Sequence, residues 1–304
     1  MWLSRCSTRC QSIDGKLAAS RRIHLRVLVW NNCRMDSSET RPLPAPHDSQ
    51  GRKTRRVCVS GAGSGMGHQI ALTFAGQGCH LVLVGRRLSR LEATAQACRD
   101  VGAASVVTAA IDLRDSGCAR ALATLVKEGP FSAVIAAAGG NAELNSDAPV
   151  ASGLAWTDWH WTENFRTNVL TAVNLIEGLR DADGLAAHGA VVLFSSIAAF
   201  RGSGTGSYGG MKAALHTYAF DLARTLGPQG TTVNVIAPGY VADTEFFGSS
   251  MTPERYNALV AQTLTGRAGQ PEDIAATVSW LCSPAAGHIT GQVIQVNGGS
   301  HVGL

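Results

Sequence analysis

The chain of 304 residues is 45% hydrophobic, as is usual for a globular protein with a sizeable core. Its formal net charge of +4 is unevenly spread, because residues 1–56 carry 12 Lys and Arg against 4 Asp and Glu, whereas residues 57–304 carry 14 against 18. The mildly acidic body offers no basic surface for nucleic acid, and no apolar run approaches the roughly 18 residues of a membrane span. We therefore expect a soluble protein that binds neither nucleic acid nor membranes.

The N-terminal residues differ in character from the rest of the chain. Residues 1–52 show no sustained hydrophobic period, and the stretch 41–53 has the Pro and Ser content of a linker. We predict a disordered basic extension over 1–52 and one folded domain over 53–304. The Arg-rich start resembles a mitochondrial presequence, but it also resembles translation from a start codon placed too early, with Met35 as the real start. We favour a nonfunctional tail on a cytoplasmic protein, with mitochondrial targeting as the alternative.

Eight cysteines are scattered along the chain, and none forms the C-x-x-C pair of a zinc ribbon or a redox site. Cys58 and Cys79 fall within apolar runs, where a thiol usually packs as a small hydrophobe. We expect reduced thiols without a catalytic role and no metal site.

From residue 55 onward, short apolar runs alternate with stretches that repeat apolar residues at i, i+3 and i+4. The predicted strands are 55–60, 80–85, 104–112, 132–139, 189–196, 231–239 and 291–299. The predicted helices are 66–77, 88–99, 117–128, 158–179, 207–226 and 271–282. Because this alternation is typical of βαβ units, the sequence predicts an α/β fold: a single doubly wound, Rossmann-like parallel sheet of about seven strands with helices on both faces.

A glycine-rich loop, SGAGSGMG at 60–67, joins the first predicted strand to the first predicted helix. At this position a glycine turn lets backbone N–H groups at a helix start approach a pyrophosphate. The glycines follow a G-x-x-x-G-x-G spacing rather than G-x-G-x-x-G. The predicted dinucleotide-binding residues of the loop are Gly61, Gly63, Ser64, Gly65, Met66 and Gly67.

The stretch SYGGMKAAL at 207–215 places Tyr208 and Lys212 four positions apart, on one face of a predicted helix. A tyrosine can donate the proton that carbonyl reduction requires, although its ordinary pKa of about 10 is too high for efficient exchange near neutrality. A nearby ammonium and the positive charge of an oxidised nicotinamide would lower that pKa. The pair is therefore a candidate acid/base.

The glycine spacing, the Tyr-x-x-x-Lys pair and the APG after the sixth strand (237–239) together resemble the short-chain dehydrogenase/reductase family. The resemblance covers residues 55–300. Its last stretch, GRAGQPEDIAATVSWLCSPAAGHITGQVIQVNGGS at 266–300, is most similar to the branch that includes 3-oxoacyl carrier-protein reductases. The resemblance implies one nicotinamide-binding domain over 53–304 that forms a homo-oligomer, a tetramer or a dimer.

The end of the second strand indicates which nicotinamide cofactor binds. In such domains a carboxylate there binds the ribose 2′-hydroxyl, whereas an arginine accommodates a 2′-phosphate. Here Gly85 stands in the place of the acid, and Arg86 and Arg87 follow. The family often carries a further basic residue in the glycine loop, where this chain has Ser64. We predict NADP(H) in preference to NAD(H); the alternative is that the arginines are solvated residues at a helix start.

The resemblance assigns further cofactor contacts after the third and fourth strands. It places Asp112 against the adenine amino group with Leu113 beside the ring, although Asp112 also suits the cap of the following helix. Ala138 and Gly139 allow the backbone to approach the cofactor closely. Ala137 stands where the family usually has Asn.

For catalysis, the resemblance adds Asn168, whose side chain helps to hold a water that returns protons to Lys212, which itself also binds the ribose hydroxyls. It also adds a serine at the end of the fifth strand that orients the carbonyl. The usual separation from Tyr208 selects Ser195, whereas the usual place as the second serine of the pair selects Ser196. Because a slip within a strand would reverse the faces that the two serines present, we choose Ser196 and place a one-residue deletion in the loop that follows.

Pro238 and Gly239 follow the sixth strand, at the carboxyl edge where such sheets bind ligands. The resemblance places the backbone of Val241 and the hydroxyl of Thr244 against the nicotinamide carboxamide.

Two segments, 140–160 and 243–266, should shape the substrate pocket. The first of them and the residue after it hold three tryptophans, which either line an apolar substrate wall or pack their own helix: Trp156, Trp159 and Trp161.

Together these residues predict an NADP(H)-dependent oxidoreductase that reduces a ketone or 3-oxoacyl group of a small molecule to a secondary alcohol, or the reverse, with Tyr208 as acid/base. A non-catalytic nucleotide-sensing regulator of the same fold is the alternative, which an intact Asn, Ser, Tyr and Lys set disfavours. Sugar-nucleotide epimerases and dehydratases share Tyr-x-x-x-Lys, but those relatives have a G-x-x-G-x-x-G loop and a larger carboxyl-terminal domain.

Overall fold

The computed structural model describes residues 55–145 and 152–303. The predicted extension over 1–52 lies outside the described residues. Seven strands form a parallel sheet in the order β3-β2-β1-β4-β5-β6-β7. The strands are β1 (Arg56–Ser60), β2 (His80–Gly85), β3 (Ser105–Ala110), β4 (Phe131–Ala136), β5 (Leu185–Phe194), β6 (Thr232–Pro238) and β7 (Gln292–Val296). All seven predicted strands and the predicted fold class are confirmed.

The central strands are mostly apolar and buried because helices cover both faces of the sheet. Every residue of β1 (RVCVS) and of β6 (TVNVIAP) is buried, whereas β3 at the sheet edge is partly exposed. Side chains alternate between the faces, so that Val57 and Val59 pack with Phe74 on one side while Cys58 packs with Leu175 on the other. The sheet therefore lies between two apolar layers.

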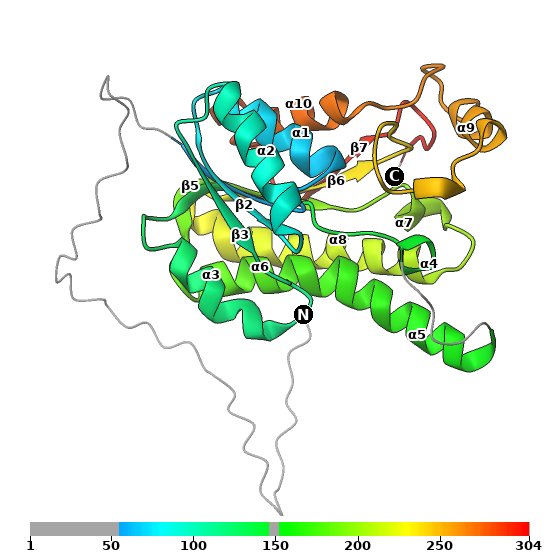
Figure 1. Ribbon diagram of the computed structural model, residues 1–304, viewed down its shortest axis with the longest axis horizontal. Helices are drawn as coiled ribbons and strands as arrows, with labels where there is room; N and C mark the ends of the chain where they lie inside the picture. The colour runs from blue at the N-terminus through cyan, green and yellow to red at the C-terminus, as the bar shows by residue number, and fades with distance from the viewer. Residues whose placement is uncertain (1–54, 146–151, 304) are drawn as a thin grey trace, which may run out of the picture. The chain divides into compact units, whose positions relative to one another are not determined.

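The helices that supply these layers are arranged in two groups. Helices α1, α2 and α10 lie on one face of the sheet, and α3, α6 and α8 lie on the other (Figure 1). The helices are α1 (Gly65–Ala75), α2 (Leu88–Asp100), α3 (Ala119–Leu125), α4 (Ala142–Asn145), α5 (Gly153–Phe165), α6 (Thr171–Arg180), α7 (Ala198–Arg201), α8 (Ser207–Leu226), α9 (Pro253–Val260) and α10 (Pro271–Leu281). Within the described ranges, no helix has the length and apolar character needed to cross a bilayer.

Some boundaries differ from the sequence prediction. The helix predicted over 158–179 begins earlier, at Gly153, and is interrupted by a π-helical turn at Arg166–Leu170 that separates α5 from α6. Strand β5 begins at Leu185 rather than 189, across a register irregularity opposite β4. The short helices α4, α7 and α9 were not predicted, because few residues in each repeat at a helical spacing.

The last strand is fastened to its neighbour by a buried amide side chain. Asn234 on β6 is 1% exposed. Its Nδ2 donates to the Ile289 carbonyl at 2.7 Å, and its Oδ1 accepts from the Gln292 N–H at 3.1 Å. The side chain thus satisfies two backbone groups at the point where the chain enters β7.

We expect Asn234→Ala to destabilise the fold by about 1–3 kcal/mol, because a buried carbonyl and an N–H lose their partner. Urea unfolding of the full chain, followed by circular dichroism, measures the change. The matched control is Asn257→Ala, an exposed asparagine on α9, which should change the unfolding free energy by less than about 0.5 kcal/mol. Equal effects of the two substitutions would contradict this role for Asn234.

Candidate active site

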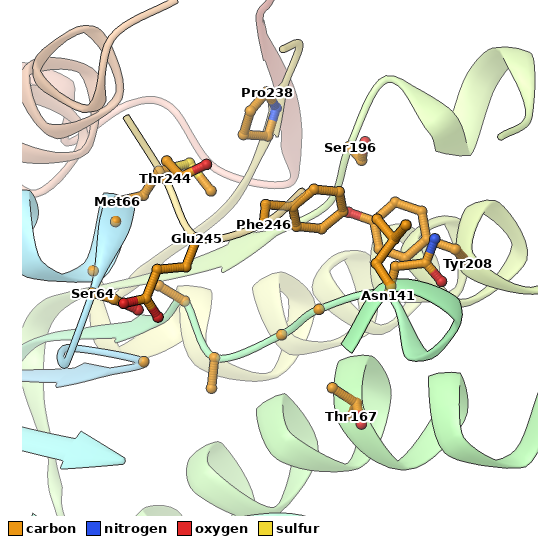
Figure 2. Close-up of a pocket in the computed structure, with 18 of the residues that line it drawn as sticks. Ser64, Met66, Asn141, Thr167, Ser196, Tyr208, Pro238, Thr244, Glu245 and Phe246 are labelled. Atoms are coloured by element: carbon orange, nitrogen blue, oxygen red, sulfur yellow. The ribbon is translucent and has the colours of Figure 1, made fainter. Parts of the chain in front are cut away.

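A cleft of about 690 Å³ opens at the carboxyl ends of the strands, around the junction of β1 with β4. This junction is where the strand order reverses, and open α/β sheets bind ligands at such a point. The glycine loop lines one part of the cleft, and Ser196 and Tyr208 line another (Figure 2). The fold therefore gathers most of the predicted site residues around one cavity.

The glycine loop is shaped by close backbone contacts. Gly61 has a φ of +68°, and a Cβ on it would lie 2.8 Å from the backbone N of Ala138. A Cβ on Gly67 would lie 2.3 Å from the Gly61 carbonyl oxygen. Helix α1 then starts with no acidic residue in its first turn, and the Ser64 side chain caps no N–H group there. The residues present thus fit the pyrophosphate of a dinucleotide, which binds at such a helix start.

The end of the cleft where we expect the adenosine is rich in arginine. Predicted residues Arg86 and Arg87 line it together with Arg90, which the prediction missed. Arg90 lies one helical turn after Arg87, a spacing that was available in the sequence. Glu245, from the segment after β6, pairs with Arg87 and Arg90, and the hydrogen bond from Arg87 lowers the pKa of its carboxyl.

Asp112 and Leu113 both line this end of the cleft. The Asp112 carboxylate forms an ion pair with Arg114 at 2.7 Å. The hydrogen bonds from the Arg114 side chain lower the pKa of Asp112. It does not cap the following helical turn, where the Asp115 side chain accepts from the Gly117 N–H instead. The alternative considered for Asp112 is therefore wrong.

The segment after β4 passes close to the catalytic candidates. The Ala138 N–H donates to Ser60 Oγ at 3.2 Å. A Cβ on Gly139 would lie 3.0 Å from Asn168 Oδ1 and 3.0 Å from Lys212 Nζ. A larger residue at position 139 would therefore push against both of these side chains.

Tyr208 and Lys212 both point inward from α8 and are almost fully buried. Lys212 Nζ donates to the Phe194 carbonyl at 2.9 Å and lies 5.8 Å from the centre of the Tyr208 ring. A hydrogen bond with Ser196 lowers the pKa of Tyr208, but burial outweighs it and raises that pKa to about 12. Burial likewise lowers the pKa of Lys212 to about 8. The expected lowering of the tyrosine pKa is thus absent from the protein alone, because desolvation dominates.

The two candidate serines face different neighbours. Ser195 Oγ donates to the Lys212 carbonyl at 3.0 Å and lies 2.8 Å from His216 Nε2, so its side chain is directed to α8. Ser196 Oγ accepts from the Ala198 N–H at 3.2 Å and also bonds Tyr208. The structure brings Ser196, and not Ser195, to the tyrosine hydroxyl.

The glycines of SYGGMK allow close packing around Tyr208. A Cβ on Gly209 would lie 2.6 Å from the Ala198 carbonyl oxygen of α7, and Gly210 packs against the Trp161 ring.

The tryptophans of α5 contact other helical residues. Trp156 stacks on His160. In the described part of the chain, none of the three tryptophans lines the cleft: Trp156 and Trp159 lie against their own helix, and Trp161 packs against α8.

Asn168 lies in the π-helical turn and holds the segment after β4. Its Oδ1 accepts from the Gly140 N–H at 3.1 Å, and its Nδ2 donates to the Gly140 carbonyl at 2.7 Å. Behind it, Asn164 Nδ2 donates to Ser207 Oγ at 2.9 Å, and His160 Nδ1 lies 2.9 Å from the same hydroxyl. This buried network was missed, although a polar residue every four positions along the predicted helix was its signal.

The predicted nicotinamide contacts follow β6. Pro238, Gly239, Val241 and Thr244 all line the cleft. A Cβ on Gly239 would lie 2.9 Å from Asn297, so β6 and the residues after β7 approach closely there. Thr244 Oγ1 donates to the Val241 carbonyl at 3.2 Å.

Aromatic side chains line the remaining part of the cleft. The Phe246 ring lies 5.6 Å from that of Tyr208, and Phe247 lies 4.9 Å from Phe246 (Figure 2). Leu144 and Leu259 add aliphatic surface. Across residues 55–145 and 152–303, no cluster of three His, Cys, Asp or Glu side chains has a metal-binding arrangement.

Comparisons with known proteins agree with this geometry. Residues 61–301 match the family profile described as enoyl-(acyl carrier protein) reductase. Galactitol 2-dehydrogenase (L-tagatose-forming) from Cereibacter sphaeroides is 31% identical over 247 residues, which are 80% of this chain and 93% of that protein. The 3-oxoacyl-[acyl-carrier-protein] reductase of Escherichia coli (strain K12) is 28% identical over 247 residues, 80% of this chain and 96% of that protein.

Solved structures share the fold. A short-chain dehydrogenase/reductase, glucose/ribitol dehydrogenase, from Brucella melitensis superimposes with a TM-score of 0.72 at 29% identity, covering 82% of this chain and 97% of that one. A 7α-hydroxysteroid dehydrogenase complexed with NADH and 7-oxo glycochenodeoxycholic acid gives 0.70 at 27%, covering 81% and 93%. A blue fluorescent protein from a metagenomic library, in complex with NADPH, gives 0.69 at 25%, covering 82% and 98%.

The family profile spans most of the chain, the curated relatives align over nearly their whole length, and the solved structures superimpose over more than four fifths of the chain. The chain belongs to the short-chain dehydrogenase/reductase family.

Proposed function

We propose that this protein is an NADP(H)-dependent oxidoreductase that interconverts a carbonyl and a secondary alcohol. The observation that carries the proposal is the placement of Ser196 and Tyr208 in one cleft beside buried Lys212, with a glycine turn at the other end of that cleft. The oxidoreductases among the relatives support the reaction class.

The side chains around Tyr208 suit acid/base chemistry. A bound nicotinamide supplies a hydride to the carbonyl carbon or accepts one from the alcohol carbon. Ser196 and Tyr208 both present a hydroxyl to the carbonyl oxygen, and Tyr208 transfers its proton to that oxygen as negative charge develops there. The Lys212 ammonium stabilises the resulting phenolate, and Asn168 holds the backbone beside Lys212 through Gly140. Oxidation of the alcohol reverses these steps.

The pKa of Tyr208 fits proton donation in the reductive direction. Burial raises it to about 12, so the phenol is protonated at neutral pH. Positive charge beside the ring favours the phenolate and brings the pKa closer to neutrality. The charge state of Lys212, whose pKa burial lowers to about 8, therefore matters for how readily Tyr208 ionises.

The cofactor preference rests on the adenosine end of the cleft. Gly85 ends β2 where a carboxylate would bind the 2′-hydroxyl, and Arg86, Arg87 and Arg90 present guanidinium groups there. Guanidinium groups match phosphate by both charge and geometry. These observations support NADP(H) over NAD(H).

The substrate end supports a small molecule with an apolar body. Phe246, Phe247, Leu144 and Leu259 line that end around Tyr208. Ketones and 3-oxoacyl compounds are therefore the substrate classes to test, and a 3-oxoacyl reductase is among the relatives. By likeness to the family we further propose a cytoplasmic homo-oligomer, a tetramer or a dimer.

Tyr208→Phe should bind NADPH as the parent does but lose about 10²–10⁴-fold in kcat on any accepted ketone, because the proton donor is gone. NADPH absorbance with a panel of ketones and 3-oxoacyl thioesters measures turnover, and fluorescence titration measures binding. Tyr218→Phe is the control, since Tyr218 lies on the same helix but donates to Glu177. Full activity of Tyr208→Phe would end the acid/base assignment.

Alanine substitutions of the two serines should have different effects on kcat. Ser196→Ala should lower kcat by about 10²-fold and shift the alkaline limb of the pH profile to higher pH, because the lost hydrogen bond had lowered the pKa of Tyr208. Ser195→Ala should change kcat only a few-fold, since its hydroxyl bonds α8. The reverse order of effects would assign the carbonyl-orienting role to Ser195.

Arg87→Ala should weaken NADPH binding by about tenfold or more and leave NADH binding unchanged, because only NADPH carries a 2′-phosphate. Fluorescence titration at fixed ionic strength gives both dissociation constants. Arg99→Ala, an exposed arginine at the far end of α2, is the control. Equal affinity of the parent protein for NADPH and NADH would overturn the cofactor preference.

A further inference from the structure

The arginines at the adenosine end of the cleft already have an anionic partner. Glu245 Oε2 lies 3.0 Å from Arg87 Nη2, and Glu245 Oε1 lies 3.0 Å from Arg90 Nη2. Each carboxylate oxygen thus contacts one guanidinium, and Arg87 Nη2 also lies 3.5 Å from Ser64 Oγ. In Figure 2 the Glu245 side chain reaches toward Ser64 across the cleft.

We propose that Glu245 is a specificity-determining residue of the cofactor site, an internal anion that competes with the cofactor's 2′-phosphate for Arg87 and Arg90. The inference rests on the proposed NADP(H) function. A 2′-phosphate bound after β2 needs the same N–H donors that the carboxylate now uses. Two anions side by side on these guanidinium groups would repel one another. Glu245 must therefore leave the arginines when NADP(H) binds.

NAD(H) carries no 2′-phosphate and therefore does not need the N–H donors of Arg87 and Arg90. A ribose 2′-hydroxyl is neutral and donates a hydrogen bond to a carboxylate, which is how a carboxylate at the end of the second strand recognises NAD(H) in other nucleotide domains. Glu245 can stay on the arginines while that cofactor binds. The carboxylate therefore reduces the preference for NADP(H) below the level that three arginines alone would give.

The exposure of the three side chains determines how strongly Glu245 changes the affinity for the 2′-phosphate. Arg87, Arg90 and Glu245 are 57%, 55% and 47% exposed, so solvent screens both ion pairs. Solvated pairs of this kind change an equilibrium by only about two- to fivefold each. Glu245 thus tunes the affinity for the 2′-phosphate and does not block it.

The decisive variant is Glu245→Gln, which keeps the length of the side chain and removes its charge. Isothermal titration calorimetry of the full chain at fixed ionic strength should give dissociation constants for NADP⁺, NAD⁺ and 2′,5′-ADP. We expect NADP⁺ and 2′,5′-ADP to bind about three- to tenfold more tightly to the variant than to the parent, and NAD⁺ to bind no more tightly. The unchanged response to NAD⁺ also reports that the variant is folded.

Two controls make the result specific. Glu254→Gln removes the same charge from α9, where the carboxylate contacts Thr252 and neither arginine, and should leave all three affinities unchanged. In an Arg87→Ala/Arg90→Ala background, the effect of Glu245→Gln should disappear. Unchanged NADP⁺ affinity in Glu245→Gln, or equal tightening of NADP⁺ and NAD⁺, would overturn the inference.

Failure of the inference and failure of the proposed cofactor are separable. If the parent prefers NADP⁺ and Arg87→Ala abolishes that preference, the NADP(H) proposal stands whatever Glu245→Gln does. If the parent binds NADP⁺ no more tightly than NAD⁺ and Arg87→Ala alters neither, the cofactor proposal fails, and the inference fails with it.

Discussion

The turn after β1 packs directly on the backbone after β4, and at Gly61 only a hydrogen fits between them. The carbonyl of Gly61 in this turn also packs against Gly67 at the start of α1. The strand, the turn and the helix are therefore in backbone contact at two positions, Gly61 and Gly67, where a Cβ does not fit. Because β1 and β4 are neighbours at the point where the strand order reverses, this contact also fixes where the cleft opens. The position of the cleft therefore depends on this close backbone approach, which the hydrogen bond from the Ala138 N–H to Ser60 Oγ supports.

A second close approach, at Gly139, links the cofactor end to the candidate catalytic groups. Asn168 approaches this glycine from the π-helical turn, and Lys212 approaches it from α8. A buried ammonium needs compensation, and Lys212 finds it in the Phe194 carbonyl at the end of β5. Burial then moves the pKa of Lys212 down and that of Tyr208 up, which favours the neutral forms of both. A charged ligand that binds in the cleft would therefore act on two groups whose pKa values desolvation has already changed.

Local sequence patterns predicted the strands, most helices and the glycine loop, because each depends on residues close together in the chain. The choice between Ser195 and Ser196 was different, since spacing and strand position disagreed, and only the packing of α8 against β5 separates them. Arg90 could have been predicted from the sequence, because it lies one helical turn after Arg87. Glu245 carried no such signal, because it meets Arg87 from 158 residues away along the chain.

The segment after β6 connects the two ends of the cleft through three consecutive residues. Thr244 packs against the glycine loop at Gly65, Glu245 pairs with the arginines, and Phe246 lies against Tyr208 (Figure 2). The three side chains contact different partners from consecutive positions of one backbone segment. A displacement of this backbone would alter all three contacts together, whereas a rotation of the half-exposed Glu245 side chain alone would release the arginines and leave Phe246 against Tyr208. The ion pairs of Glu245 can therefore change without a change in the aromatic contact.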